Sequence, residues 1–181
     1  MTCIVAIEDG SRSWIAADTG VTSGDGAKDN AKGKAWIHEP SGVAFGVAGN
    51  LSLCQAVRYG IRVPKPSPKM SGMEWCVRRL VPAIRRALGD SPQVDENGLI
   101  EMHMVVAVRG EVYEIDPSLA VTRSPRGYTS IGSGADFAHG SLFSTKKQAP
   151  KRRACLAVES ACAHHAGCSL PIEVLCVGGD A

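Results

Sequence analysis

The chain begins with two apolar, β-prone segments side by side, and this start constrains the fold more than any other feature. Residues 2–8 and 13–19 are dominated by Val, Ile, Ala and Thr, and Asp9-Gly10 between them is typical of a tight hairpin turn. A hairpin this early predicts that the N-terminus itself lies in a sheet. It also favours antiparallel pairing over the regular strand–helix alternation of a parallel sheet.

The second residue carries chemical potential of its own. Thr2 follows the initiator methionine, and methionine aminopeptidase removes Met when the next residue is small. Removal would leave Thr2 with a free α-amine and a hydroxyl, a nucleophile that brings its own base. Many proteins begin Met-Thr without using it, so this start alone does not decide between a catalytic residue and an ordinary terminus.

The rest of the chain alternates between groups of strands and pairs of helices. Asn50 is a candidate N-cap, Ser71 and Glu74 form a candidate capping box, and Pro82 should bend or split the helix that contains it. The polar, Gly-rich residues 22–33 are expected to form a surface loop. Further strands are expected at 34–38, 43–48, 101–108, 111–115, 119–122, 128–131 and 172–177, and helices at 51–59, 71–88, 136–144 and 150–165.

This order predicts an α+β fold. Strands joined by short turns pair antiparallel, and a helix pair inserted between strand groups can cover the outer face of a sheet. The expected architecture is a four-layer α-β-β-α sandwich of two mainly antiparallel sheets. With 181 residues and no internal repeat, residues 1–181 are expected to form a single domain.

Composition excludes several functional classes. Hydrophobic residues make up 44% and charged residues 21% of the chain, which is typical of a globular protein. No apolar run approaches the ~18 residues that span a membrane, and the start does not resemble a signal peptide. A cytoplasmic location with no membrane partner is expected. The net charge of +2 is too small to indicate a nucleic-acid partner.

The cysteines and histidines do not indicate a metal centre. The seven cysteines are scattered, none forms a C-x-x-C pair, and no His pair has zinc spacing beside them. His164 and His165 are adjacent, so on a helix their side chains point in different directions. Neither a metal nor another cofactor is expected.

Five short features carry a resemblance to a known family. They are Thr2-Cys-Ile-Val, Ala17-Asp18, Lys34 before an apolar run, Gly46-Val-Ala-Gly49 and Ile131-Gly-Ser-Gly134. In this order the chain resembles the proteasome β-subunit superfamily of N-terminal nucleophile (Ntn) hydrolases, especially bacterial and phage proteasome-like subunits and the HslV peptidase ring. The resemblance covers nearly the whole chain and implies the Ntn-hydrolase fold.

The resemblance assigns roles to individual residues. Thr2 would be the nucleophile, a cationic lysine beside it would favour the neutral, basic form of its amine, and an acidic residue would hold that lysine. Where the family has a supporting acid near the end of the last helix, this chain has His165. The implied catalytic residues are Thr2, Asp18, Lys34 (with Lys32 as the alternative) and Ser133, and the implied oxyanion or substrate-binding residues are Ala48, Gly49, Gly46 and Thr22.

The resemblance therefore implies a threonine-type peptidase subunit that hydrolyses peptide bonds through an acyl-enzyme on Thr2. It implies peptide or unfolded-protein substrates and a homo-oligomeric ring, and it allows an ATPase unfoldase as a further partner. Two other functions stay open. The chain could be a catalytically latent subunit that only assembles rings, above all if Met1 is retained, or an amidase for small molecules with the same N-terminal chemistry.

Overall fold

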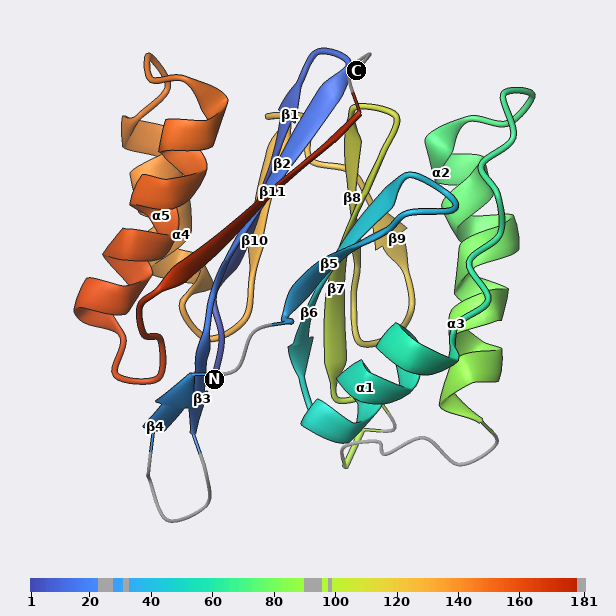
Figure 1. Ribbon diagram of the computed structural model, residues 1–181, viewed down its shortest axis with the longest axis horizontal. Coiled ribbons are helices and arrows are strands. Elements are labelled where there is room, and N and C mark those ends of the chain that lie inside the picture. Colours follow the sequence, from blue (N-terminus) through green and yellow to red (C-terminus); the bar gives the residue numbers. More distant parts are fainter. Residues whose placement is uncertain (23–27, 31–32, 90–95, 98, 179–181) are drawn as a thin grey trace.

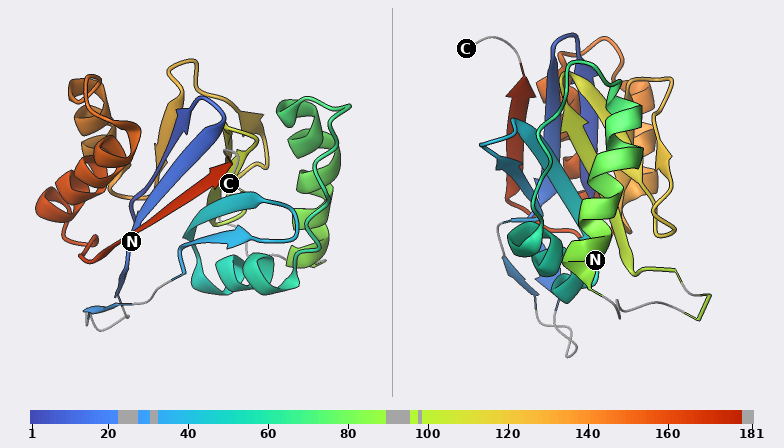
Figure 2. Two further views of the ribbon diagram at one scale, coloured as in Figure 1. Left: turned by 45° about the horizontal axis from the view of Figure 1, so that its top comes forward. Right: turned by 90° about the vertical axis from the view of Figure 1, so that its right-hand side faces the viewer.

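Two antiparallel sheets pack face to face, and helices cover both outer faces (Figure 1). The structure, a computed structural model, describes residues 1–22, 28–30, 33–89, 96–97 and 99–178. The layers run from one helix pair through both sheets to the second group of helices, and the views in Figure 2 show the same order. The predicted α-β-β-α sandwich is confirmed.

The first sheet contains the N-terminal hairpin. Its order is β10-β1-β2-β11, and each neighbouring pair is antiparallel. Because strand side chains alternate, Ile4 and Ala6 pack between the sheets while Val5 and Ile7 pack under the helices. The strands are β1 (Ile4–Asp9), β2 (Arg12–Asp18), β10 (Tyr128–Ile131) and β11 (Ile172–Gly178).

The second sheet is a meander whose strands follow the chain in order. Met104 and Val106 face the helices on one side, while Val105 and Ala107 face the first sheet. The order is β5-β6-β7-β8-β9, again antiparallel throughout. The strands are β5 (Ala35–His38), β6 (Val43–Gly49), β7 (Met102–Val108), β8 (Glu111–Ile115) and β9 (Val121–Thr122).

Helices on the second sheet begin where the sequence predicts, and the expected irregularity at Pro82 is a π-helical turn. The Asn50 side chain accepts a hydrogen bond from the Ser52 amide at the start of α1 (Leu51–Gly60), and Ser71 accepts from the Glu74 amide. The long helix after Ser71 is continuous, with a wider π-helical turn just before Pro82. Because proline lacks an N–H and its ring crowds the carbonyl four residues earlier, the wider turn accommodates it. Its parts are α2 (Gly72–Trp75), η1 (Cys76–Leu80) and α3 (Val81–Leu88).

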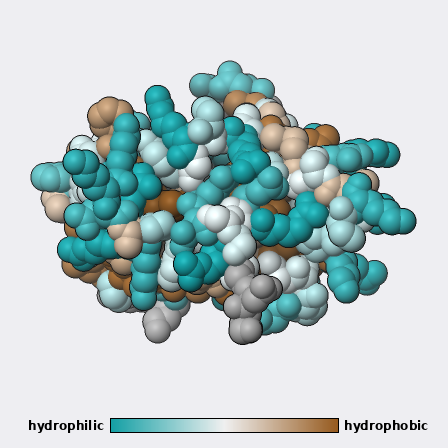
Figure 3. Space-filling model, turned by 90° about the horizontal axis from the view of Figure 1, so that it is seen from above, coloured by the Kyte–Doolittle hydropathy of each residue, from teal (hydrophilic) through white to brown (hydrophobic). Residues whose placement is uncertain are grey.

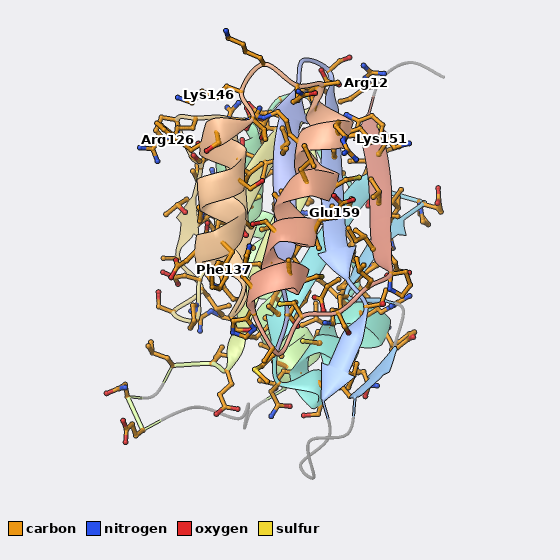
Figure 4. All side chains as sticks on the ribbon, turned by 90° about the vertical axis from the view of Figure 1, so that its left-hand side faces the viewer. Arg12, Arg126, Phe137, Lys146, Lys151 and Glu159 are labelled. Carbon is orange, nitrogen blue, oxygen red and sulfur yellow. The ribbon has the colours of Figure 1, made fainter. Side chains whose placement is uncertain are left out.

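The other outer layer is formed by α4 (Ala135–Ser144) and α5 (Pro150–His164). Small residues such as Ala154, Ala157 and Ala161 let α5 lie close to the first sheet. Lys151 and Glu159 lie on its solvent side, as Figure 4 shows, and polar side chains cover most of the face seen in Figure 3. No helix in the described part of the chain is long and apolar enough to span a membrane.

One expectation was wrong. Residues 22–33, predicted to be a plain surface loop, contain part of a small hairpin formed by β3 (Gly20–Thr22) and β4 (Lys28–Asn30). The hairpin projects from the end of the sheets where the N-terminus lies (Figure 1). Backbone pairing rather than apolar alternation holds these strands together, and this explains why the sequence pattern did not reveal them.

Candidate active site

Asp18, at the end of β2, is a fully buried carboxylate surrounded by hydrogen-bond donors. Its Oδ1 accepts from the Cys3 amide at 2.8 Å, and its Oδ2 accepts from the amides of Gly20 at 3.0 Å and Ser169 at 3.3 Å. A buried charge is tolerated only when it is paired and hydrogen-bonded. The three amides come from three different segments, so Asp18 fixes the N-terminus and the loop after α5 around one point.

Lys34 supplies the counter-charge. Its Nζ lies 2.9 Å from Asp18 Oδ1 and 3.0 Å from Oδ2, and its side chain is only 12% exposed. The same ammonium donates to the Met1 carbonyl oxygen at 3.3 Å. Only two covalent bonds separate that oxygen from the Thr2 nitrogen. The ion pair therefore places a positive charge directly beside the position where a Thr2 amine would form.

Ser133 reaches the same nitrogen from the other side. The Thr2 backbone N–H donates to Ser133 Oγ at 3.2 Å, and the Thr2 carbonyl accepts from the Gly134 amide at 3.1 Å. Gly132 has φ +89°, and a Cβ there would lie 2.3 Å from the Thr2 carbonyl oxygen. Glycine is therefore required for the turn to approach Thr2 this closely.

A second glycine turn, at Gly49 and Ala48, also borders the hollow that Thr2 lines. Gly49 ends β6 with φ +127°, and a Cβ there would lie 2.2 Å from the Glu101 carbonyl oxygen. The residue borders the cleft together with Thr2. The family resemblance assigned oxyanion binding to the backbone of Gly49 and Ala48.

The cleft has two hollows that meet at Thr2. The α1 hollow has a volume of about 380 Å³ and extends from Thr2 and Lys34 along α1 to Arg58. The β7 hollow has a volume of about 630 Å³ and runs past Ser133 to His103. A chain bound across both hollows would pass over the Thr2 side chain.

The remaining sequence-predicted residues either lie away from the cleft or fall outside the described part of the chain. Gly46 packs between the sheets, where a Cβ would lie 2.7 Å from Ile4 and 2.9 Å from Val105, so the expectation that it borders the cleft was wrong. The Thr22 backbone is in β3, but its side chain lies outside the described residues, as does Lys32. His165 Nδ1 accepts from the Gly167 amide at 3.1 Å and so stabilises the turn after α5.

Sequence reasoning missed Ser169. Its amide donates to Asp18, and its carbonyl accepts from the Thr19 amide at 3.3 Å. A serine in the short connection 165–171 carries no distinguishing pattern, so only the fold reveals this contact. Within the part of the chain that the structure describes, no cluster of three or more His, Cys, Asp or Glu side chains has the arrangement to hold a metal ion.

The layered arrangement is a fold shared with solved structures of proteasome-type N-terminal nucleophile hydrolases. BPH from Thiobacillus denitrificans in complex with epoxomicin has a TM-score of 0.79 at 17% identity, over 97% of this chain and 98% of that chain. HslV from Trypanosoma brucei has a TM-score of 0.70 at 18% identity, over 98% of this chain and 99% of that chain. Anbu, the ancestral beta-subunit from Yersinia bercovieri, has a TM-score of 0.73 at 15% identity, over 97% of this chain and 81% of that chain.

No family model matches the chain, and no curated protein sequence matches it either. The likeness is therefore one of structure, and it establishes the shared fold.

Proposed function

We propose that this chain is a threonine-type peptidase subunit in which Thr2, once Met1 is removed, hydrolyses peptide bonds. The observation that carries the proposal is the convergence of the Asp18–Lys34 pair and Ser133 on the Thr2 nitrogen. The Thr2 hydroxyl has no hydrogen-bond partner within the described residues, although Thr2 is only 8% exposed. The Thr2 hydroxyl oxygen therefore forms no hydrogen bond in the part of the chain that the structure describes, although Asp18, Lys34 and Ser133 nearby do.

In the proposed reaction the Thr2 amine takes the hydroxyl proton while Oγ attacks the substrate carbonyl carbon. Lys34 keeps the amine neutral by charge repulsion, and Asp18 keeps Lys34 in place. Backbone amides at Gly49 and Ala48 stabilise the oxyanion, an effect worth roughly 3–4 kcal/mol per donor in known hydrolases. The amine then protonates the leaving nitrogen, and water hydrolyses the resulting ester on Thr2.

The similar structures support this reading through their shared fold. One of them, BPH, was solved in complex with epoxomicin. On the same grounds we expect peptide or unfolded-protein substrates, a homo-oligomeric ring and a cytoplasmic location. An ATPase unfoldase is a further partner that the likeness to HslV allows.

The second candidate is a latent subunit that keeps Met1. With Met1 attached, the Thr2 nitrogen is a peptide amide and its N–H is already donated to Ser133. Lys34 donates to the Met1 carbonyl instead of facing a free amine. A chain that keeps Met1 would hold the fold and the ion pair without turnover.

The test compares Thr2→Ala with Thr2→Ser in peptide hydrolysis. Both small residues permit Met1 removal. Ala removes the γ-methyl group and the hydroxyl, whereas Ser removes the methyl group alone, so the pair isolates the effect of the hydroxyl. The hydroxyl forms no hydrogen bond among the described residues, so both variants should fold. We expect Thr2→Ala to lose at least about 1,000-fold in kcat/KM and Thr2→Ser to retain measurable turnover. Wild-type rates from a folded Thr2→Ala protein would eliminate Thr2 as the nucleophile.

A further inference from the structure

The α1 hollow has a pronounced charge character. Its described lining residues include no acidic side chain, and its two cationic members are Lys34 and Arg58. Lys34 is neutralised by Asp18. Burial raises the pKa of the Cys54 thiol to about 11, so this group of the wall is uncharged at neutral pH. Among the charged side chains of the described lining, Arg58 therefore has no ionic partner.

Arg58 is held in place on three sides. Its Nη1 donates to the Gly33 carbonyl at 2.6 Å. Its guanidinium carbon lies 5.5 Å from the centre of the Trp36 ring and 5.4 Å from that of Tyr59, both within cation–π range. Trp36 is itself stacked on Phe45 with ring centres 5.4 Å apart. The guanidinium is thus positioned before any ligand arrives.

The chain also makes room for this arginine. Gly33 has φ +110°, and a Cβ there would lie 1.7 Å from Arg58 Nη1, so any side chain at this position would displace the guanidinium. Glu173, a nearby carboxylate, accepts the Gly33 amide at 3.0 Å. No ion pair to Arg58 is present among the described residues. Of five N–H groups on the guanidinium, one is used, and a planar fork remains for a carboxylate.

The rest of the wall suits the stem of such a ligand. Val47, Leu51 and Cys54 offer apolar or neutral surface between Thr2 and Arg58. Figure 1 shows α1 and the N-terminus at the same end of the two sheets. A substrate side chain with an aliphatic stem and a terminal carboxylate could pack its stem against these residues and place its carboxylate at Arg58.

We propose that Arg58 is a specificity-determining residue and that the α1 hollow binds an acidic substrate side chain, Glu or Asp, next to the bond that Thr2 cleaves. This inference rests on the proposed function and names its substrate class. The carboxylate takes the free edge of the guanidinium in charge-assisted hydrogen bonds, which are about twice as strong as neutral ones. Glutamine has the same shape without the charge and serves as the matched substrate.

The experiment measures peptide binding in the Thr2→Ala protein, so that it does not depend on turnover. Fluorescent peptides that differ only by Glu or Gln at the positions flanking the scissile bond are titrated by anisotropy. We expect the Glu peptide to bind roughly 10-fold more tightly at one flanking position, and we expect this ratio to fall with added salt. In Thr2→Ala/Arg58→Gln the ratio should fall to about one, and Arg58→Lys should restore part of it.

Arg62 provides the control for general charge. It is exposed, lies just beyond α1 and does not border the hollow. Arg62→Gln removes the same charge and should leave the Glu/Gln ratio unchanged. Thermal unfolding of each variant confirms that the fold is intact.

The outcomes separate the two proposals. Equal affinity for the Glu and Gln peptides, or no binding of either, overturns the role of Arg58. A Glu preference that disappears in Arg58→Gln supports it, even if wild-type protein cleaves nothing. A Glu preference in a wild-type protein that cleaves no peptide would support the binding site and contradict only the peptidase proposal.

Discussion

Each end of the N-terminal hairpin has a hydrogen-bonded carboxylate, and the surroundings of the two carboxylates differ. At the cleft end, Asp18 is fully buried and binds one cation and three backbone amides. At the turn end, Glu8 accepts from the Val112 amide and from Arg123 through two nitrogens, and Arg123 also pairs with Glu111. The Arg123 side chain is 40% exposed.

The difference in burial bears on what each carboxylate contributes to the protein. A partly exposed network can stabilise by joining the strands of both sheets, and it tolerates water. A largely buried ion pair contributes little net stability, since apolar residues of similar volume often stabilise as well. Under the proposed function, the position of Asp18 and Lys34 beside the Thr2 nitrogen accounts for their burial, and Glu8 and Arg123 have no such role.

Of the two hairpin ends, the cleft end should show the larger effect, through Asp18→Asn. Asparagine keeps the shape of the side chain but removes its charge. Its NH₂ group replaces an oxygen that accepted hydrogen bonds, so one donor would then face another donor. We expect kcat/KM to fall on the order of 100-fold as Lys34 loses its anchor, and stability to fall by about 3 kcal/mol. Peptide hydrolysis measured well below the unfolding midpoint separates the two effects. A folded Asn variant with wild-type rates would show that the buried pair is merely structural.

A smaller and purely structural effect should follow from Glu8→Gln. The change keeps an acceptor for the Val112 amide but removes the ion pairs to Arg123. We expect a loss of about 1 kcal/mol in the free energy of unfolding at pH 7, within the range of exposed pairs with good geometry. Hydrolysis at saturating substrate should not change. Loss of activity without loss of stability would erase the proposed contrast between the two ends.

The same variant has a defined pH dependence. Burial alone would raise the pKa of the Glu8 carboxyl, but hydrogen bonds from Arg123 and Val112 and the Arg123 charge outweigh burial and hold that pKa below its ordinary value of 4.5. A depressed folded-state pKa adds stability above pH 4.5, and this contribution is lost as the pH falls through the folded pKa. The stability difference between wild type and Glu8→Gln should therefore shrink below that pH in denaturant titrations.

The sequence predicted the parts of the molecule that local patterns specify. Apolar alternation located the strands of both sheets, and Asn50 and Ser71 marked two helix starts. The resemblance correctly brought Lys34 next to Asp18 and Ser133 next to Thr2. It could not find Ser169 or Arg58, because their positions depend on how distant segments meet.

Gly46 shows the opposite limit. A glycine in an apolar strand fits either an open cleft or a close approach of two sheets, and here Ile4 and Val105 fill the space above it. The hairpin of β3 and β4 was missed because its strands are short and polar. Only tertiary structure separates these alternatives.

The most direct test of the account is the mature N-terminus of protein that hydrolyses peptides. Intact-mass spectrometry before and after incubation with a peptide epoxyketone reads both the terminus and the reactive residue. The account predicts that Met1 is absent and that one adduct forms through the amine and hydroxyl of Thr2. Active protein that retains Met1, or an adduct on any other residue, would contradict it.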